Sequence, residues 1–205
     1  MANKNKQGFG LIAAGMLGQT PATQGLGKYK IDAGYATTIY NGGAVASAAG
    51  YIVDGQGTDT AIIGTLNGIF YNAATTLKPT FANFYTQVTP ANSEDIDAFV
   101  YDGPTQQYVV STDAAVAQAG FLETYDMNAS AGSDITGKSS STLDIGDTSA
   151  DAATFRLLRT AEDPENEDLI TTPQTNPALA AFSGQATVVV VANKSQWFTT
   201  GSVGA

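Results

Sequence analysis

Apolar and polar residues alternate over short stretches from Ile31 onward, and turn sequences interrupt them about every ten residues. Residues 35–40 and 45–53 are rich in small, β-branched and aromatic side chains, and Asn41-Gly42-Gly43 between them is a turn signal. This spacing, with almost no helical periodicity, predicts an all-β fold. We expect a single β-sandwich or barrel-like domain, jelly-roll-like in character, with an extended N-terminal arm and little helix.

Three later segments refine this expectation. Residues 98–101 and 107–111 flank Asp102-Gly103-Pro104 and predict a hairpin. Four consecutive valines, Val188 to Val191, predict a strand that is buried on both faces. A short helix is expected only at 113–119, with Thr112 as its N-cap and Gly120 at its end.

Residues 1–30 differ from the rest of the chain because they contain six glycines and few apolar side chains. They predict an extended arm on a β-rich body, residues 31–205. The apolar side chains of the arm are too few for a core of their own, so we expect them to bind another surface, the capsid or a subunit. The candidate arm residues are Lys4, Lys6, Phe9, Leu11, Ile12, Met16, Leu17, Lys28 and Lys30.

The arm and the body also differ in charge. The chain has 9 basic and 19 acidic residues, a net charge of −10, whereas residues 1–31 carry four lysines and no acid. A cationic arm predicts an acidic protein partner, such as the body of a neighbouring copy. The acidic body argues against a nucleic-acid partner, which requires Lys and Arg. No run of about 18 apolar residues occurs, so no membrane partner is expected.

Composition also restricts the chemistry. The chain has no Cys and no His, which excludes disulfides, thiolate metal sites and a Ser-His-Asp triad. No pair among the acidic residues stands out as glycosidase carboxylates. Residues 54–59 carry two aspartates and are more typical of a tight hairpin loop than of a calcium site. The acidic run 162–168 is more typical of a solvated loop than of a cation site. We therefore expect no catalytic residues, no metal and no cofactor.

One segment matches a nucleotide-binding pattern. Gly132-Ser-Asp-Ile-Thr-Gly137-Lys138-Ser139 fits G-x-x-x-x-G-K-[ST]. A working P-loop needs a helix directly after it, whereas residues 140–144 favour strand or loop. Asp134 would also place a negative charge among the phosphates. We favour a Ser/Gly-rich loop with one exposed lysine.

Aromatic residues are concentrated between 70 and 108, which is typical of a sheet core or of a subunit interface. Together with the valine run, this apolar β surface predicts a homo-oligomer, with a cyclic trimer as the expected form. Trp197 is as compatible with a core as with an interface. The candidate interface residues are Phe81, Phe84, Tyr85, Val188, Val190 and Trp197.

The order of these segments resembles structural proteins of tailed bacteriophages, especially the head decoration or capsid cement proteins. The resemblance spans most of the chain and rests on Met1-Ala-Asn-Lys-Asn5, Gly8-Phe-Gly-Leu11, Tyr29-Lys-Ile31, Gly34-Tyr-Ala-Thr37, Gly68-Ile-Phe-Tyr71, Phe81-Ala-Asn-Phe-Tyr85, Asp97-Ala-Phe-Val-Tyr-Asp102, Tyr108-Val-Val110, Phe155-Arg-Leu157 and Glu162-Asp-Pro-Glu-Asn166.

The resemblance implies a non-enzymatic virion protein on the outer surface of the capsid, where it binds the major capsid protein and bridges neighbouring subunits. The sequence is also compatible with two other functions. One is a different virion part, such as a tail or fibre component. The other is a secreted β-sandwich module that binds carbohydrate.

Overall fold

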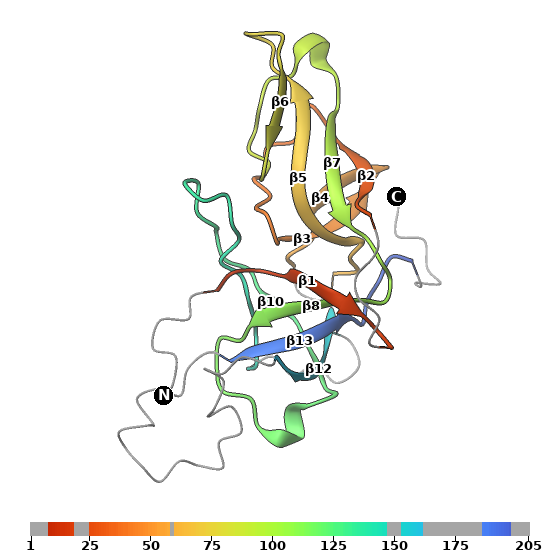
Figure 1. Ribbon diagram of the computed structural model, residues 1–205, viewed down its shortest axis with the longest axis vertical. Helices are drawn as coiled ribbons and strands as arrows, with labels where there is room; N and C mark the ends of the chain where they lie inside the picture. Colours follow the sequence, from red (N-terminus) through yellow and green to blue (C-terminus); the bar gives the residue numbers. More distant parts are fainter. Residues whose placement is uncertain (1–7, 19–24, 58–59, 147–152, 162–185, 198–205) are drawn as a thin grey trace.

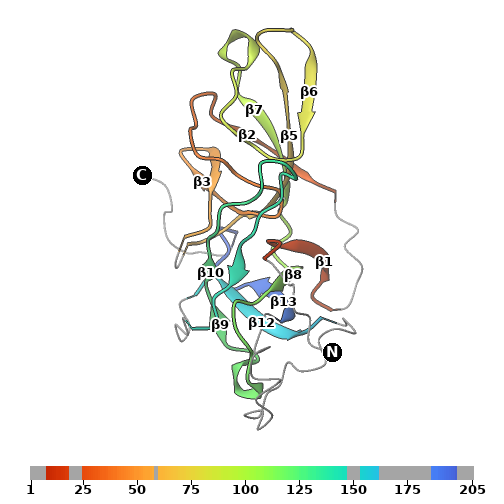
Figure 2. The ribbon, with the colours of Figure 1, turned by 90° about the vertical axis from the view of Figure 1, so that its left-hand side faces the viewer.

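The computed structural model describes residues 8–18, 25–57, 60–146, 153–161 and 186–197. They form an all-β protein in which two antiparallel sheets stack along the long axis of the molecule (Figure 1). We call them the upper and the lower sheet after their positions in Figure 1. A view turned by 90° shows them as two separate layers (Figure 2). The all-β prediction is therefore confirmed. The helices in the described part of the chain are two single 3-10 turns, Ala91–Ser93 and Gln118–Gly120, and none of its helices has the length or apolar character to cross a membrane.

The upper sheet has the strand order β2-β7-β5-β3-β4, and β6 also pairs with β5. The sheet is strongly curved: its two edge strands, β2 and β4, lie close together, so the sheet nearly closes into a barrel around one core. Its strands are β2 (Gly27–Ile31), β3 (Ala44–Ala48), β4 (Tyr51–Asp54), β5 (Gly64–Asn72), β6 (Pro79–Ala82) and β7 (Ile96–Tyr101). The enclosed side chains include Ile31, Ile39, Ile52, Leu66, Ile69, Tyr85, Ile96 and Val100.

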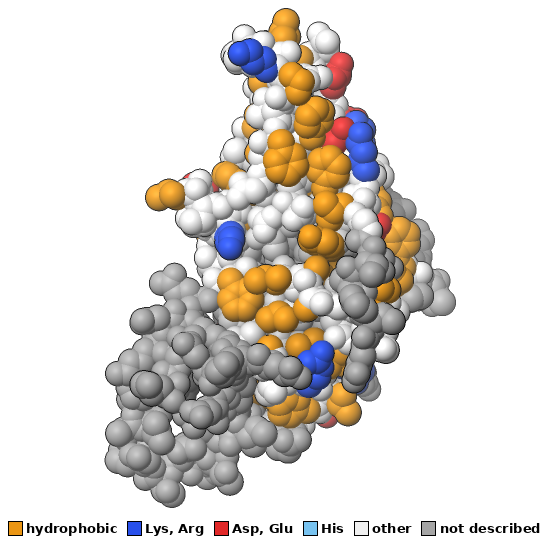
Figure 3. Space-filling model, viewed as in Figure 1, with side chains coloured by type: hydrophobic (Ala, Val, Ile, Leu, Met, Phe, Trp, Pro, Cys, Tyr) orange, Lys and Arg blue, Asp and Glu red, His pale blue; other side chains and the backbone are white. Residues whose placement is uncertain are grey.

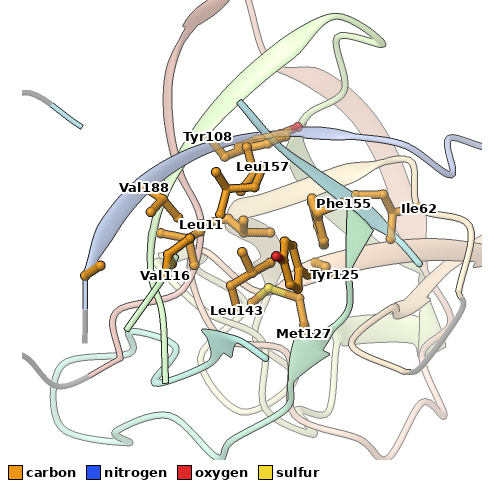
Figure 4. Close-up of a cluster of buried hydrophobic side chains, with 14 residues drawn as sticks. Leu11, Ile62, Tyr108, Val116, Tyr125, Met127, Leu143, Phe155, Leu157 and Val188 are labelled. Atoms are coloured by element: carbon orange, nitrogen blue, oxygen red, sulfur yellow. The ribbon is translucent and has the colours of Figure 1, made fainter. Parts of the chain in front are cut away.

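The lower sheet has the order β1-β8-β13-β12-β9, and a small β10-β11 pair lies outside it. The strands are β1 (Ile12–Met16), β8 (Gln106–Ser111), β9 (Thr124–Tyr125), β10 (Met127–Asn128), β11 (Thr142–Leu143), β12 (Phe155–Thr160) and β13 (Thr187–Ala192). All four valines from Val188 to Val191 are buried, which confirms the prediction for this strand. Figure 4 shows the side chains of this second core converging from several strands.

The predicted hairpin at 98–111 is wrong in its pairing, although both strands exist. β7 pairs with β2 and β5 of the upper sheet, whereas β8 pairs with β1 and β13 of the lower sheet. The turn closed by the Gln106 amide on the Gly103 carbonyl carries the chain from one sheet to the other. A local turn signal therefore marks the crossover between the sheets.

The predicted helix at 113–119 is also wrong. The Thr112 amide donates to the Ala186 carbonyl (2.8 Å) and the Asp113 amide donates to the Leu143 carbonyl (3.0 Å). The Thr112 hydroxyl donates to the Ala114 carbonyl at 2.7 Å instead of capping a helix. These long-range partners hold the start of the segment in an extended form, and only the 3-10 turn Gln118–Gly120 follows.

The described parts of segment 1–30 are built into the body. β1 pairs with β8, and β2 pairs with β7. The Leu11 amide donates to the Gly42 carbonyl at 2.8 Å, and the Leu11 side chain is only 2% exposed among the lower core residues (Figure 4). The expectation that Leu11 needs the surface of another molecule is thereby corrected, since its own chain supplies the partner.

Candidate binding surface

The outward face of the upper sheet combines aromatic and charged side chains in one row. Phe81 on β6 lies opposite Phe70 on β5, Phe70 lies opposite Asp97 on β7, and Asp97 lies opposite Lys30 on β2. Because directly opposed residues share a face, the four side chains cross the sheet from an apolar to a charged edge. The alternate residues Ile69 and Ala98 point into the upper core.

A second row lies beside the first and consists of Gly68, Phe99 and Lys28. The ring of Phe81 lies over Gly68, where a Cβ atom would come within 2.8 Å of it. The same ring contacts that of Phe99, with centroids 6.2 Å apart. Phe81 is 62% exposed, and Figure 3 shows a column of hydrophobic side chains over this part of the molecule. We call Phe70, Phe81 and Phe99 the aromatic platform.

The charged half of the face is an ion-pair cluster. The Asp97 carboxylate accepts from Lys28 Nζ at 2.8 Å and from Lys30 Nζ at 2.6 Å. Burial raises the pKa of Asp97, but the bonds from Lys28 and Lys30 outweigh it and hold the pKa below its ordinary value. The bond to Asp97 raises the pKa of Lys30. Two of the lysines predicted for intermolecular contacts are thus bound to an acid of their own chain.

A pocket of about 270 Å³ lies where the aromatic and charged halves meet. Phe70, Asp97 and Lys30 of the first row form one side, and the other side comes from the end of β5 and from the turn before β7. Asp95 in this turn accepts a hydrogen bond from the Tyr51 hydroxyl at 3.2 Å. The remaining lining residues are Tyr71, Asn72, Pro90 and Glu94.

The segment that matched the nucleotide-binding pattern is a closed loop. The Ser133 amide donates to the Lys138 carbonyl (3.0 Å), and Gly137 donates to the Ser133 carbonyl (2.6 Å). Lys138 is exposed, and β11 follows the loop where a P-loop would have a helix. The loop amides are therefore used internally, and the geometry needed to hold phosphates does not form.

The glycines of this loop serve packing. A Cβ on Gly132 would lie 2.4 Å from the Tyr40 ring, and Gly137 has a left-handed φ of +69° beside Asn83 and Phe84. The Tyr40 hydroxyl donates to the Asp134 carboxylate (2.7 Å), and the Tyr40 ring stacks on Phe84 at 5.6 Å. The loop is thus braced by two segments, at Tyr40 and at 83–84.

The tip of the same loop carries Ile135, which is 96% exposed, the highest exposure among the large apolar side chains that the structure describes. The neighbouring Thr136 carbonyl accepts from Asn83 Nδ2 at 2.7 Å, which fixes the backbone next to the tip. Figure 1 shows this teal segment projecting sideways from the body. A braced loop therefore presents an isolated aliphatic side chain to solvent.

The other candidate arm residues are dispersed. Ile12 and Leu17 are exposed, whereas Phe9 and Met16 are half-buried. Lys4 and Lys6 lie outside the described residues. The described arm residues thus divide between core, sheet face and surface, and they form no single patch with Leu11.

The candidate interface residues divide in the same way. Tyr85, Val188 and Val190 have no exposed surface, because each is enclosed in one of the two cores. This burial corrects their assignment as interface residues, since a second subunit could not reach them. Phe81 and Trp197 are exposed and Phe84 is half-buried, so these three remain available for contact.

Sequence reasoning missed Phe70, Phe99, Asp97 and Ile135 as surface residues. Side chains alternate between the two faces of a strand, so the sequence of 96–101 places Asp97 and Phe99 on the face opposite to the core residues Ile96 and Ala98. The shared face of Asp97 and Phe99 was therefore predictable from the sequence. The exposure of Ile135 was not predictable from the sequence, because it depends on contacts between the loop and a distant segment. In the described part of the chain no three acidic side chains are grouped to hold a metal ion, and the acidic run 162–168 lies outside it.

Comparisons of the chain with protein-family models, with curated proteins and with solved structures found no match.

Proposed function

We propose that this protein is a non-enzymatic structural component of a bacteriophage virion that binds the outside of the assembled head and bridges its capsid subunits. The observation that carries the proposal is the braced loop 132–138 with Ile135 at its tip. The Ile135 side chain, 96% exposed at the tip of this loop, gains almost no burial in the isolated protein. The arrangement is favourable when Ile135 enters an apolar pocket of a partner, where burial of such a side chain is worth roughly 1.5–3 kcal/mol.

Other features support a role as a capsid cement protein. The order of sequence segments resembles that family. The antiparallel sheets carry exposed apolar side chains at several points, so one molecule can contact more than one neighbour. A protein that binds the assembled lattice but not free subunits stabilises the lattice by mass action. Weak contacts repeated over many copies then add through effective concentration.

The proposal is tested with capsid shells assembled from the major capsid protein encoded in the same genome as this chain. Purified full-length protein is added to shells that lack it, and occupancy is measured after sedimentation. We expect saturable binding by the wild type and occupancy reduced at least tenfold in Ile135→Asp, because a charge cannot enter an apolar pocket without a large desolvation cost.

Leu122→Asp is the matched control, because Leu122 is 61% exposed at a different site. The control should bind as the wild type does. Absence of wild-type binding to the shells would overturn the proposal, and equal loss in both variants would overturn the role of Ile135. A tail or fibre component is the alternative, and it would remain with the tails when tailed particles are separated into heads and tails.

A further inference from the structure

We infer that the aromatic platform and the adjoining pocket on the upper sheet form a binding site for a neutral saccharide. The inference concerns other residues than those of the Ile135 loop and does not depend on capsid binding. It rests on the cross-strand rows that place Phe81, Phe70, Asp97 and Lys30 side by side and on the pocket of about 270 Å³ at their junction.

The platform supplies the apolar part of the site. A pyranose ring has two faces formed by C–H groups, and these pack against aromatic rings. Phe81 is 62% exposed and is held over Gly68 against Phe99, so its position is fixed before a ligand arrives. A fixed aromatic surface costs little conformational entropy on binding.

The pocket supplies the polar part. Its lining mixes two aromatic residues with the amide of Asn72, the ammonium of Lys30 and the carboxylate of Asp97. Most of the lining residues are polar or charged, so the pocket suits hydroxyl groups, and the apolar wall typical of small-molecule sites comes from the neighbouring aromatic platform. The volume of about 270 Å³ lies just below the usual range for such sites, which begins at about 300 Å³, and therefore suits a small unit such as one sugar of a longer chain.

The polar groups are also held in place. Lys28 and Lys30 fix Asp97, and the Tyr51 hydroxyl fixes Asp95. Sugar hydroxyls can donate to these carboxylates, and hydrogen bonds to an ionised acceptor are stronger than neutral ones. Asn72 can both donate and accept, which matches a hydroxyl in either role.

Charge distinguishes a neutral sugar from other occupants. Three carboxylates, those of Glu94, Asp95 and Asp97, line the pocket. The positive charges of Lys28 and Lys30 are paired with Asp97. An anionic sugar would be repelled. A protein that covered the same face would have to desolvate these carboxylates, at a high cost unless it supplied matching cations.

The experiment uses the isolated full-length protein and a panel of soluble probes. The neutral probes are maltotriose, cellotriose, mannotriose, galactotriose and chitotriose, and the anionic probes are trigalacturonate and sialyllactose. Binding is measured by calorimetry and by saturation-transfer NMR. We expect saturable binding of at least one neutral probe and no binding of the anionic probes. Binding confined to the anionic probes, or no binding at all, would overturn the inference.

Two variants locate the site. Phe81→Ala should weaken binding of the positive probe about tenfold through loss of the stacking surface, whereas Leu77→Ala, at another highly exposed apolar residue near the same strand, should leave it unchanged. Circular dichroism confirms that both variants are folded. Equal affinity in Phe81→Ala and the wild type would overturn the inference. Light scattering gives a second test. If Phe81→Ala changed the mass of the particle in solution but left sugar binding unchanged, the platform would be a protein interface and the inference would be overturned.

Discussion

The Tyr40 hydroxyl donates a hydrogen bond of 2.7 Å to the carboxylate of Asp134, a residue 94 positions later in the chain. This bond fastens the projecting loop 132–138 to the segment that leads into the upper sheet. The Tyr40 ring also stacks on Phe84, which lies beside Gly137 of the loop. The geometry of the loop is thus set by contacts distant in sequence.

Removal of this bond should loosen the loop without unfolding the protein. In Tyr40→Phe the ring still stacks on Phe84, so we expect the free energy of unfolding to fall by only about 1 kcal/mol. Hydrogen exchange of the amides in 132–138 should accelerate, and occupancy on capsid shells should fall severalfold. Unchanged exchange in this loop would show that the Tyr40–Asp134 bond does not brace it.

The same pair predicts a spectroscopic signature. The bond to Asp134 raises the pKa of Tyr40 above its ordinary value, because loss of the phenolic proton would place two negative charges together. In Asp134→Ala the pKa of Tyr40 should fall toward the ordinary value. Ultraviolet titration of tyrosine ionisation in the wild type, Asp134→Ala and Tyr40→Phe measures this shift. Identical titration curves for wild type and Asp134→Ala would contradict the assignment.

Leu11 should contribute to the stability of the body. Its side chain is enclosed in the lower core, so Leu11→Ala should lower the free energy of unfolding by about 2–5 kcal/mol in urea titrations. Ile12→Ala is the matched control, since its side chain is 52% exposed, and it should cost much less. Deletion of residues 2–27 should destabilise the lower sheet as well, because it removes β1 from β8. Equal stability of Leu11→Ala and the wild type would contradict the structure.

Asp97 should make stability depend on pH in the acid range. Its pKa is held below the ordinary value in the folded protein, so the ion-pair stabilisation is complete above the unfolded pKa, near pH 4, and is lost as pH falls through the folded value. The difference in urea midpoint between the wild type and Asp97→Asn should therefore be constant from pH 7 to about pH 5 and shrink below pH 4.

Glu123→Gln provides the comparison, because Glu123 is exposed. Its difference from the wild type should stay small across the same pH range. If the Asp97→Asn difference were as large at pH 3 as at pH 7, the ion pairs with Lys28 and Lys30 would not be the cause.

The loop glycines and lysine should behave differently. Gly137→Ala should destabilise the protein by at least about 1 kcal/mol, because φ is +69° and the new Cβ would lie 2.6 Å from Asn83 and Phe84. Lys138→Ala should leave stability unchanged, since Lys138 is exposed. Calorimetry of the wild type with ATP or GTP and magnesium should show no binding heat. A saturable heat that disappears in Lys138→Ala would restore the nucleotide-binding interpretation.

Local patterns predicted the strands well because burial follows the alternation of side chains along a strand. The run Val188 to Val191 lies in β13, and the predicted strand 98–101 lies in β7. Pairing was less predictable: the turn at Gly103 has hairpin chemistry, yet it leads from one sheet to the other. Which strand a segment pairs with depends on distant residues that no local pattern contains.

The surface residues show the same limit. The absence of acids from residues 1–31 places Lys28 and Lys30 in a predicted cationic arm, whereas their partner Asp97 lies across the sheet on β7. Leu11 was assigned to another surface because its own segment has too few apolar residues, yet the lower core is assembled from residues as distant as Val190. Composition gives the charge and apolar content of these segments but does not identify the partners that the fold supplies.

A reconstruction of the decorated capsid by electron cryomicroscopy tests the central proposal most directly. The shells are imaged with and without the added full-length protein, and the structure is fitted into the difference density. The account predicts density on the outer surface, with loop 132–138 and Ile135 against the major capsid protein at a junction between subunits. Difference density that is absent from the shell, or density in which Ile135 faces solvent, would contradict it.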